Sequence, residues 1–322
     1  MLSKNNIHIG KVIDKGVLSI VNECTLNGKK YIVKIEHITL KDKDDKNSLI
    51  WNEINFSLKF ANKYPENFMS LIHYSFEENC KNIKLLWKNS EPLGLWSDQL
   101  ISEYKKRIAE NICIYKIYTR MDTILNKILN KLSHLQLYSM LIQVSYAMRL
   151  LHKHNYIHGD LHIANIGVMK TRINTKIKLG KNTIPTYGYQ YKLIDFGMTL
   201  HKNDALTVYD KKRFFNETNH TYDDGIFFTL CQFILTDGYN YDKKIKILKK
   251  TQEFLFINEI NSTNTTIQEY LYMTLFPDKY ISIFSGKIFS KALLPIPDLI
   301  FFAKYGIHSN ETYEYLLSKI NK

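Results

Sequence analysis

Two segments decide the fold of this chain, His158-Gly159-Asp160-Leu161-His162-Ile163-Ala164-Asn165 and Leu193-Ile194-Asp195-Phe196-Gly197. Both place oxygen-bearing side chains beside apolar stretches. Carboxylate and amide oxygens are ligands that Mg²⁺ accepts in proteins. A lone Asp or Asn is more commonly a turn residue or a helix cap. The fixed order of Asp160, Asn165 and Asp195 favours a shared chemical role over three separate caps.

The spacing of these residues matches the protein-kinase motifs H-R-D-L-x-x-x-N and D-F-G. On this basis the chain resembles the eukaryotic-type protein kinase superfamily. The resemblance implies an α+β, bilobal protein-kinase-like fold, with a small β-rich N-lobe and a mainly helical C-lobe. It also implies ATP and Mg²⁺, or Mn²⁺ in its place, as cofactors. Asp160 would orient and deprotonate the acceptor hydroxyl, and Asn165 and Asp195 would hold the metal on the nucleotide phosphates.

The segment from Asp14 to Val21 is the counterpart of the phosphate loop G-x-G-x-x-G-x-V. It keeps the middle glycine, Gly16, and ends on Val21 at the valine position. A glycine there lets backbone amides approach phosphate oxygens closely. We therefore expect Gly16 and Val21 to contact the nucleotide, with an ordinary hairpin turn as the alternative.

Alternating apolar residues predict a strand over Lys29–Glu36, and Lys34 follows the register of the V-A-I-K motif. Lys34 is expected to contact the α- and β-phosphates, with Lys29 and Lys30 as surface alternatives. A helix predicted over Leu49–Asn62 carries Glu53. Glu53 is expected to pair with Lys34 and orient its ammonium group, and a solvent-facing Glu is the other interpretation.

The whole chain, residues 1–322, is expected to be a single protein-kinase-like domain. The N-lobe would cover about 1–118, the hinge about 119–122 and the C-lobe about 123–322. A strand predicted over Ile112–Tyr118 leads into this hinge, and residues 91–110 are interpreted as an insertion that contains a helix. A hinge at Trp87–Ser90 stays open as an alternative.

In the expected C-lobe, a helix over Leu135–His152 presents a sustained apolar stripe and leads to the catalytic loop. Met169–Tyr191 is interpreted as an expanded β-hairpin with turn residues near its tip. No A-P-E motif follows Gly197. Asp224, before an apolar helix, resembles the kinase Asp that anchors the catalytic-loop backbone, and a helix cap is the competing interpretation.

Two residues of the catalytic loop depart from the family pattern. Gly159 stands where most regulated kinases carry the Arg that binds an activation-loop phosphate. This predicts constitutive competence, or control by another route. His162 stands where many Ser/Thr kinases carry Lys, so it is expected to face the transferring phosphate as a weaker counter-charge.

The 322 residues are 45% hydrophobic and 23% charged, with a net charge of +13, which is a globular composition. The positive charge leaves nucleic acid or another anionic surface open as a partner besides ATP and a protein substrate. No apolar run approaches a membrane span, and the N-terminal residues lack a signal core. The four cysteines lie far apart in sequence and are interpreted as reduced, mostly buried thiols with no zinc-site spacing. A cytoplasmic protein in a reducing compartment is expected.

Within the superfamily, the H-x-D-L-x-x-x-N loop and the missing A-P-E resemble the divergent Ser/Thr kinases of large DNA viruses, including those of poxviruses and giant viruses. That resemblance implies the host cytoplasm or the virion as the location. The sequence therefore favours a Ser/Thr protein kinase that transfers the ATP γ-phosphate to protein hydroxyls. The alternatives are a small-molecule phosphotransferase of the aminoglycoside or choline kinase type, and a pseudokinase scaffold.

Overall fold

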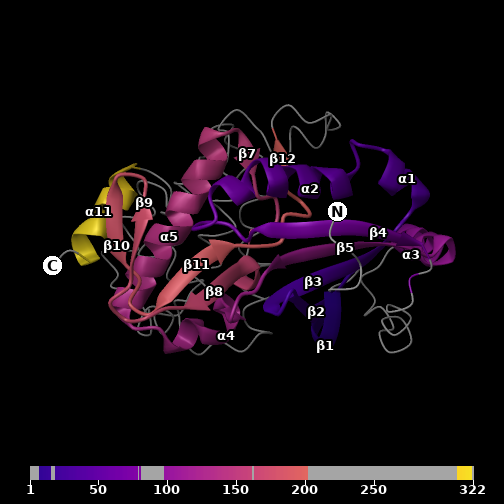
Figure 1. Cartoon of the computed structure of the whole chain (residues 1–322). Coiled ribbons are helices and arrows are strands. Elements are labelled where there is room, and N and C mark those ends of the chain that lie inside the picture. The colour runs from indigo at the N-terminus through magenta and orange to yellow at the C-terminus, as the bar shows by residue number, and fades with distance from the viewer. Residues whose placement is uncertain are drawn as a thin grey trace, which may run out of the picture. The chain divides into compact units, whose positions relative to one another are not determined.

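A computed structural model describes residues 7–15, 19–78, 80, 98–161, 163–201 and 310–320. The chain divides into two compact units (Figure 1). The first unit is Met1–Met121 together with Asp195–Thr199, and the second is Asp122–Ile194 together with Leu200–Lys322. The main division therefore falls between Met121 and Asp122, directly after the last strand of the first unit.

The first unit is built on a five-stranded antiparallel sheet in the order β1-β2-β3-β5-β4. Its strands are β1 (Ile7–Lys15), β2 (Ser19–Leu26), β3 (Lys29–Ile38), β4 (Leu71–Glu78) and β5 (Ile112–Thr119). Its helices are α1 (Leu40–Asp44), α2 (Leu49–Lys59), η2 (Ala61–Lys63) and α3 (Asp98–Glu110). The strands predicted over Lys29–Glu36 and Ile112–Tyr118 are present as β3 and β5, and the helix predicted from Leu49 is present as α2.

The register of this sheet fixes which side chains share a face. In β3, Val33, Ile35 and His37 are buried, and the residues between them are half-buried. Successive side chains of a strand point to opposite faces, so Lys34 and Glu36 lie on the face opposite to that buried series. Lys34 is the cross-strand partner of Lys116 in β5. A polar cluster and an apolar core therefore occupy opposite faces of the same strands.

Helix α2 is held by an aromatic cluster at its C-terminal end. Phe56 and Phe60 have ring centroids 5.2 Å apart, and Phe60 packs against Phe68 at 5.4 Å. The helix ends at Lys59, three residues earlier than the periodicity predicts, because Phe60 adopts a φ of −120° and begins a short 3-10 turn. Glu53 lies one turn before Phe56, so this packing fixes the position of its carboxylate.

The described part of the second unit combines three small sheets with the 20-residue helix α5. Its helices are α4 (Leu125–Ile128), η3 (Leu129–Lys131), α5 (His134–Lys153), η4 (Ile163–Asn165) and α11 (Asn310–Ile320). Its strands are β6 (Thr123–Ile124), β7 (Tyr156–Ile157), β8 (Ile166–Lys170), β9 (Lys176–Leu179), β10 (Asn182–Pro185), β11 (Tyr189–Leu193) and β12 (Leu200–His201). These strands form the sheets β11-β8-β6, β10-β9 and β12-β7.

Helix α5 begins with a capping box: the Ser133 hydroxyl accepts a hydrogen bond from the Gln136 backbone N–H, and the Gln136 side chain accepts one from the Ser133 backbone N–H. The stripe predicted from sequence is confirmed, since Leu137, Leu141 and Met148 are each at most 1% exposed. Tyr191 in β11 donates its backbone N–H to Gln143 Oε1 at 2.8 Å. The helix thus supports the β8–β11 hairpin that borders the catalytic loop.

Several predicted features lie outside the described residues. These are Gly16, His162, the alternative hinge at Trp87–Ser90 and the anchor residue Asp224. Within the described part of the chain, no helix is both long and apolar enough to cross a membrane.

The expectation that all the cysteines are free thiols is wrong for two of them. Cys80 and Cys113 form a disulfide, whereas Cys24 is a free, buried thiol. The pairing was not visible in the sequence because 33 residues separate the two positions. The register of β4 against β5 brings them together.

Candidate active site

The lysine predicted to contact phosphate lies within a group of carboxylates in the first unit. Lys34 Nζ is 2.7 Å from Asp195 Oδ1 and 3.1 Å from Glu36 Oε1. Its distance to Glu53 Oε1 is 3.9 Å, at the outer limit of an ion pair. The structure therefore brings Lys34, Glu53 and Asp195 together, with Asp195 and Glu36 as the closer partners of the ammonium group.

Glu53 makes its shortest contacts with two residues of β5. Lys116 Nζ donates to Glu53 Oε2, and the Tyr118 hydroxyl donates to Glu53 Oε1 at 2.8 Å. The Glu53 side chain is only 4% exposed and that of Lys116 is fully buried. A carboxylate so enclosed requires a compensating charge, and Lys116 supplies it.

A second carboxylate, Glu36, links the two lysines. Glu36 Oε2 accepts from Lys116 Nζ at 2.9 Å, and its other oxygen lies 3.1 Å from Lys34 Nζ. Two ammonium groups and three carboxylates thus form one continuous cluster, with a formal charge of −1. A cation would complete the charge balance, which fits the metal-binding role expected of Asp195.

The pKa values of the cluster follow from this balance. Burial raises the pKa of Glu36, but Lys116 and Lys34 outweigh burial and bring it from 4.5 to about 2. Burial lowers the pKa of Lys34, yet Glu53, Glu36 and Asp195 hold it well above its usual value. Burial, with the adjacent Glu53 carboxylate, raises the pKa of Tyr118 well above 10. Lys34 and Glu36 therefore stay charged across the neutral range, and Tyr118 stays protonated.

Sequence reasoning missed Glu36, Lys116 and Tyr118. Glu36 carries a usable signal, because a residue two positions from Lys34 in a strand shares its face. Lys116 and Tyr118 carry no comparable signal, since both read as ordinary members of a β5 strand rich in aromatic and apolar residues. Only the cross-strand pairing of Lys34 with Lys116 places the second ammonium group in this cluster.

The Asp195-Phe196-Gly197 segment packs onto helix α2. Phe196 is 1% exposed, and its ring centroid lies 4.8 Å from that of Phe56. Asp195 has a φ of +61°, a left-handed conformation that Asp and Asn adopt more readily than most residues. The buried ring anchors a turn that directs the Asp195 carboxylate to Lys34.

The catalytic-loop residues lie in the second unit. Asn165 Nδ2 donates to the Asp160 carbonyl oxygen at 2.8 Å and to Asp160 Oδ2 at 3.2 Å. Asn165 is buried, whereas Asp160 is exposed. The role expected of Asp160, contact with an acceptor hydroxyl, requires such exposure. These bonds fix the Asp160 side chain and occupy the amide nitrogen of Asn165, so its amide oxygen is the atom suited to a metal.

The backbone around this loop is held from two sides. His158 is fully buried, and its Nε2 lies 3.0 Å from the Ile194 carbonyl oxygen. The Ile194 amide donates to the Asn165 carbonyl at 3.0 Å, and Asp195 is the next residue in the chain. His158 is therefore a structural support of the loop.

Gly159 has a φ of +78°. A residue with a side chain is strained in this conformation, and Gly is not. The glycine that replaces the usual Arg is thus matched to the backbone of this loop.

Of the remaining predicted residues, Val21 lies in β2 as the cross-strand partner of Lys34. It therefore shares the face on which the Lys34 cluster lies. The amide oxygen of Asn165 and the carboxylate of Asp195 are each, taken alone, a kind of ligand that a hard divalent cation such as Mg²⁺ accepts. Bound Mg²⁺ would neutralise phosphate charge during transfer.

Residues 101–216 match the family model for protein tyrosine and serine/threonine kinase. The match includes the catalytic loop and Asp195-Phe196-Gly197, and the first unit has the antiparallel sheet that such a fold requires. The antiparallel sheet and the helices together have the mixed α+β character of a protein-kinase fold. A comparison with curated proteins finds no match.

The kinase match supports an ATP-dependent phosphotransferase that acts on protein, since this family uses ATP as the phosphate donor. The family model covers both tyrosine and serine/threonine kinases, so the match does not choose between these acceptors.

Proposed function

We propose that this kinase transfers the ATP γ-phosphate to serine or threonine hydroxyls of proteins. The observation that carries the proposal is the 2.7 Å contact between Lys34 Nζ and Asp195 Oδ1. These two residues come from motifs 161 positions apart, and each motif assigns its residue to the nucleotide phosphates or their metal. The contact between the Phe196 and Phe56 rings supports the same arrangement, as does the ionic cluster that Lys34 and Asp195 share with Glu36.

In this proposal, Lys34 binds the α- and β-phosphates, and Asn165 and Asp195 hold Mg²⁺. Asp160 orients the acceptor hydroxyl and takes its proton. Glu53 and Glu36 keep the Lys34 ammonium in position. Gly16 and Val21 contact the nucleotide, and His162 faces the transferring phosphate.

We also infer that activity does not depend on activation-loop phosphorylation, since Gly159 cannot serve as the phosphate receptor that an Arg provides. The likeness to kinases of large DNA viruses, and with it a cytoplasmic or virion location, stays a prediction from sequence.

The test is ATP- and Mg²⁺-dependent phosphate transfer by the purified full chain to generic protein substrates, with phosphoamino acid analysis of the products. Asp160→Ala should reduce transfer by roughly 10²–10⁴-fold, the usual contribution of a positioned acid or base. Asp44→Ala, which changes an exposed carboxylate of α1, is the matched control and should retain full activity.

Phosphotyrosine as the main product would contradict the Ser/Thr proposal. Transfer to amino alcohols or aminoglycosides without transfer to proteins would favour a small-molecule phosphotransferase. Nucleotide binding without any transfer would favour a scaffold.

A further inference from the structure

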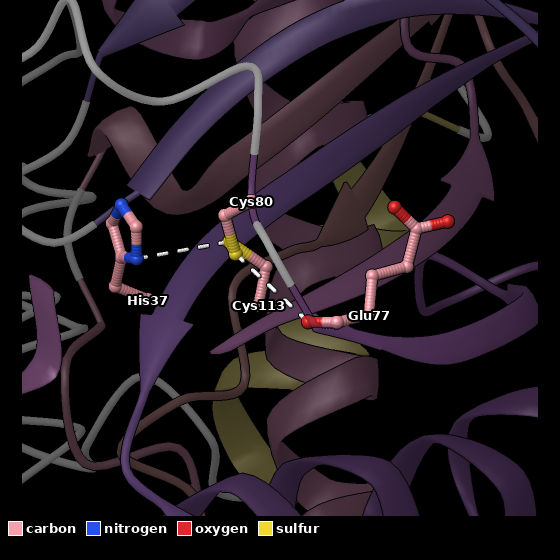
Figure 2. The surroundings of a disulfide bond; sticks show 4 residues. All are labelled: His37, Glu77, Cys80 and Cys113. Carbon is pink, nitrogen blue, oxygen red and sulfur yellow. Dashed lines mark hydrogen bonds between the residues drawn. A yellow bond between two sulfur atoms is a disulfide. The ribbon is translucent and has the colours of Figure 1, made fainter. Parts of the chain in front are cut away.

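Three metal-binding side chains converge on the face of the first-unit sheet opposite to Lys34. They are His37 of β3, Cys113 of β5 and Cys80, which follows β4. Their ligand atoms all lie within 4.8 Å of one another, and all three residues are buried. Figure 2 shows the His37 ring turned toward the two sulfur atoms, with His37 Nδ1 3.7 Å from Cys113 Sγ.

The fold positions these ligands through strand pairing. His37 and Cys113 are cross-strand partners, so their side chains emerge side by side on one face. The Cys80 amide donates to the Asn111 carbonyl at 3.3 Å, which holds Cys80 beside the start of β5. Its sulfur also lies 4.0 Å from the Glu77 carbonyl oxygen (Figure 2).

This cluster is chemically distinct from the candidate active site. Thiolate sulfur and imidazole nitrogen select Zn²⁺ and other thiophilic ions, whereas Mg²⁺ requires oxygen ligands. Lys34 and Glu36 point to the other face of β3, since their positions alternate with that of His37. An ion at the cluster would therefore not replace the metal expected at Asp195.

We propose that the reduced protein binds one Zn²⁺ ion through Cys80 Sγ, Cys113 Sγ and His37 Nδ1. The disulfide and the metal site are then two states of the same pair of sulfurs. A dithiol reductant donates two electrons and two protons to the Cys80–Cys113 bond, which breaks to give two thiols while the reductant closes into its own disulfide. The two thiols bind Zn²⁺ as thiolates and release their two protons to solvent.

The three side chains leave one position of a tetrahedral zinc ion for a further ligand. Within the described residues the cluster contains these three metal-binding groups. Each state of the site joins the segment that follows β4 to β5, and the zinc state also includes β3. Zinc should therefore raise the melting temperature of the reduced protein, because it binds the folded arrangement of ligands.

The experiment uses the full chain, which is reduced with a dithiol and treated with a chelator to remove bound metal. Both reagents are then removed by buffer exchange under oxygen-free conditions. Titration with Co²⁺ serves as the probe, because a thiolate-bound cobalt ion gives a sulfur-to-metal charge-transfer absorption that oxygen ligands do not. We expect this band to saturate at about one equivalent and to disappear when Zn²⁺ is added.

The cysteines of the chain provide matched controls. Cys80→Ser and Cys113→Ser should each weaken the charge-transfer band and the binding, while Cys24→Ser and Cys231→Ser should leave both unchanged. His37→Ala should keep a thiolate band but weaken Co²⁺ binding by at least about tenfold, since even indirect partners of a ligand contribute that much. Far-ultraviolet circular dichroism of each variant identifies any that fails to fold.

The proposal is overturned if the reduced, folded wild-type chain shows no thiolate–cobalt band. It is also overturned if Cys24→Ser or Cys231→Ser abolishes the band, or if protein oxidised to the disulfide binds Co²⁺ with the same band. These readouts do not depend on phosphate transfer, so they stand apart from the test of kinase activity.

Discussion

Replacing Lys116 with Met should destabilise the first unit more than any surface lysine replacement. The Lys116 side chain is fully buried, and its ammonium group donates to both Glu36 and Glu53. Met keeps a similar volume but removes the charge that compensates these carboxylates. Breaking a buried ion pair from one side costs about 3–5 kcal/mol, which is a large part of the roughly 5–15 kcal/mol that stabilises a typical domain.

Urea unfolding, followed by the fluorescence of tryptophans that include Trp51 of α2, measures this loss. Lys30→Met is the matched control, because Lys30 is exposed on β3 of the same sheet, and it should change the free energy of unfolding by less than about 0.5 kcal/mol. The double variant Lys116→Met, Glu36→Gln should recover part of the loss, since it removes one of the two carboxylates that bind Lys116.

The Lys116→Met penalty should also depend on pH. Without Lys116, Glu36 loses the largest of the charges that lower its pKa, so the pKa of Glu36 rises and this carboxylate becomes neutral at a higher pH than in the wild type. The penalty should therefore be smaller at pH 4 than at pH 7. A loss below about 1 kcal/mol at pH 7 would mean that Glu36 and Glu53 do not require the Lys116 charge.

Three further predictions follow from the same contacts. The pKa of Glu36 is lowered from 4.5 to about 2, which stabilises the folded state above pH 4.5, and about 3 kcal/mol of this stability should be lost as the pH falls toward 2. Urea unfolding at several pH values should show this loss in the wild type and a much smaller loss in Glu36→Gln. Asp195→Asn keeps a residue that tolerates the φ of +61° but loses the carboxylate, so phosphate transfer should be abolished while thermal unfolding changes little; near-normal transfer would contradict its role as metal ligand. Gly159→Arg places a side chain at a φ of +78° and should cost about 1–3 kcal/mol in urea unfolding, and an unchanged midpoint would contradict this strain.

Sequence alone determined the kinase-like fold and the main elements around the candidate site. The catalytic loop and Asp195-Phe196-Gly197 are local segments, so their residue order is readable without any three-dimensional information. The alternation in β3 and the apolar stripe of α5 are also local, because each is set by the repeat of one strand or one helix. These signals were sufficient to predict Lys34, Asp160, Asn165 and Asp195 as residues of the candidate site.

The tertiary structure decided which side chains share one environment. It placed Lys116 and Tyr118 on Glu53, placed Glu36 between the two lysines, and joined Cys80 to Cys113 beside His37. Each of these contacts depends on the register between strands that are distant in sequence, and a shift of one residue would turn the side chains to the opposite face. A single sequence carries no direct record of that register. The ionic cluster around Lys34 and Lys116, and the cluster of His37, Cys80 and Cys113, could therefore be identified only from the assembled sheet.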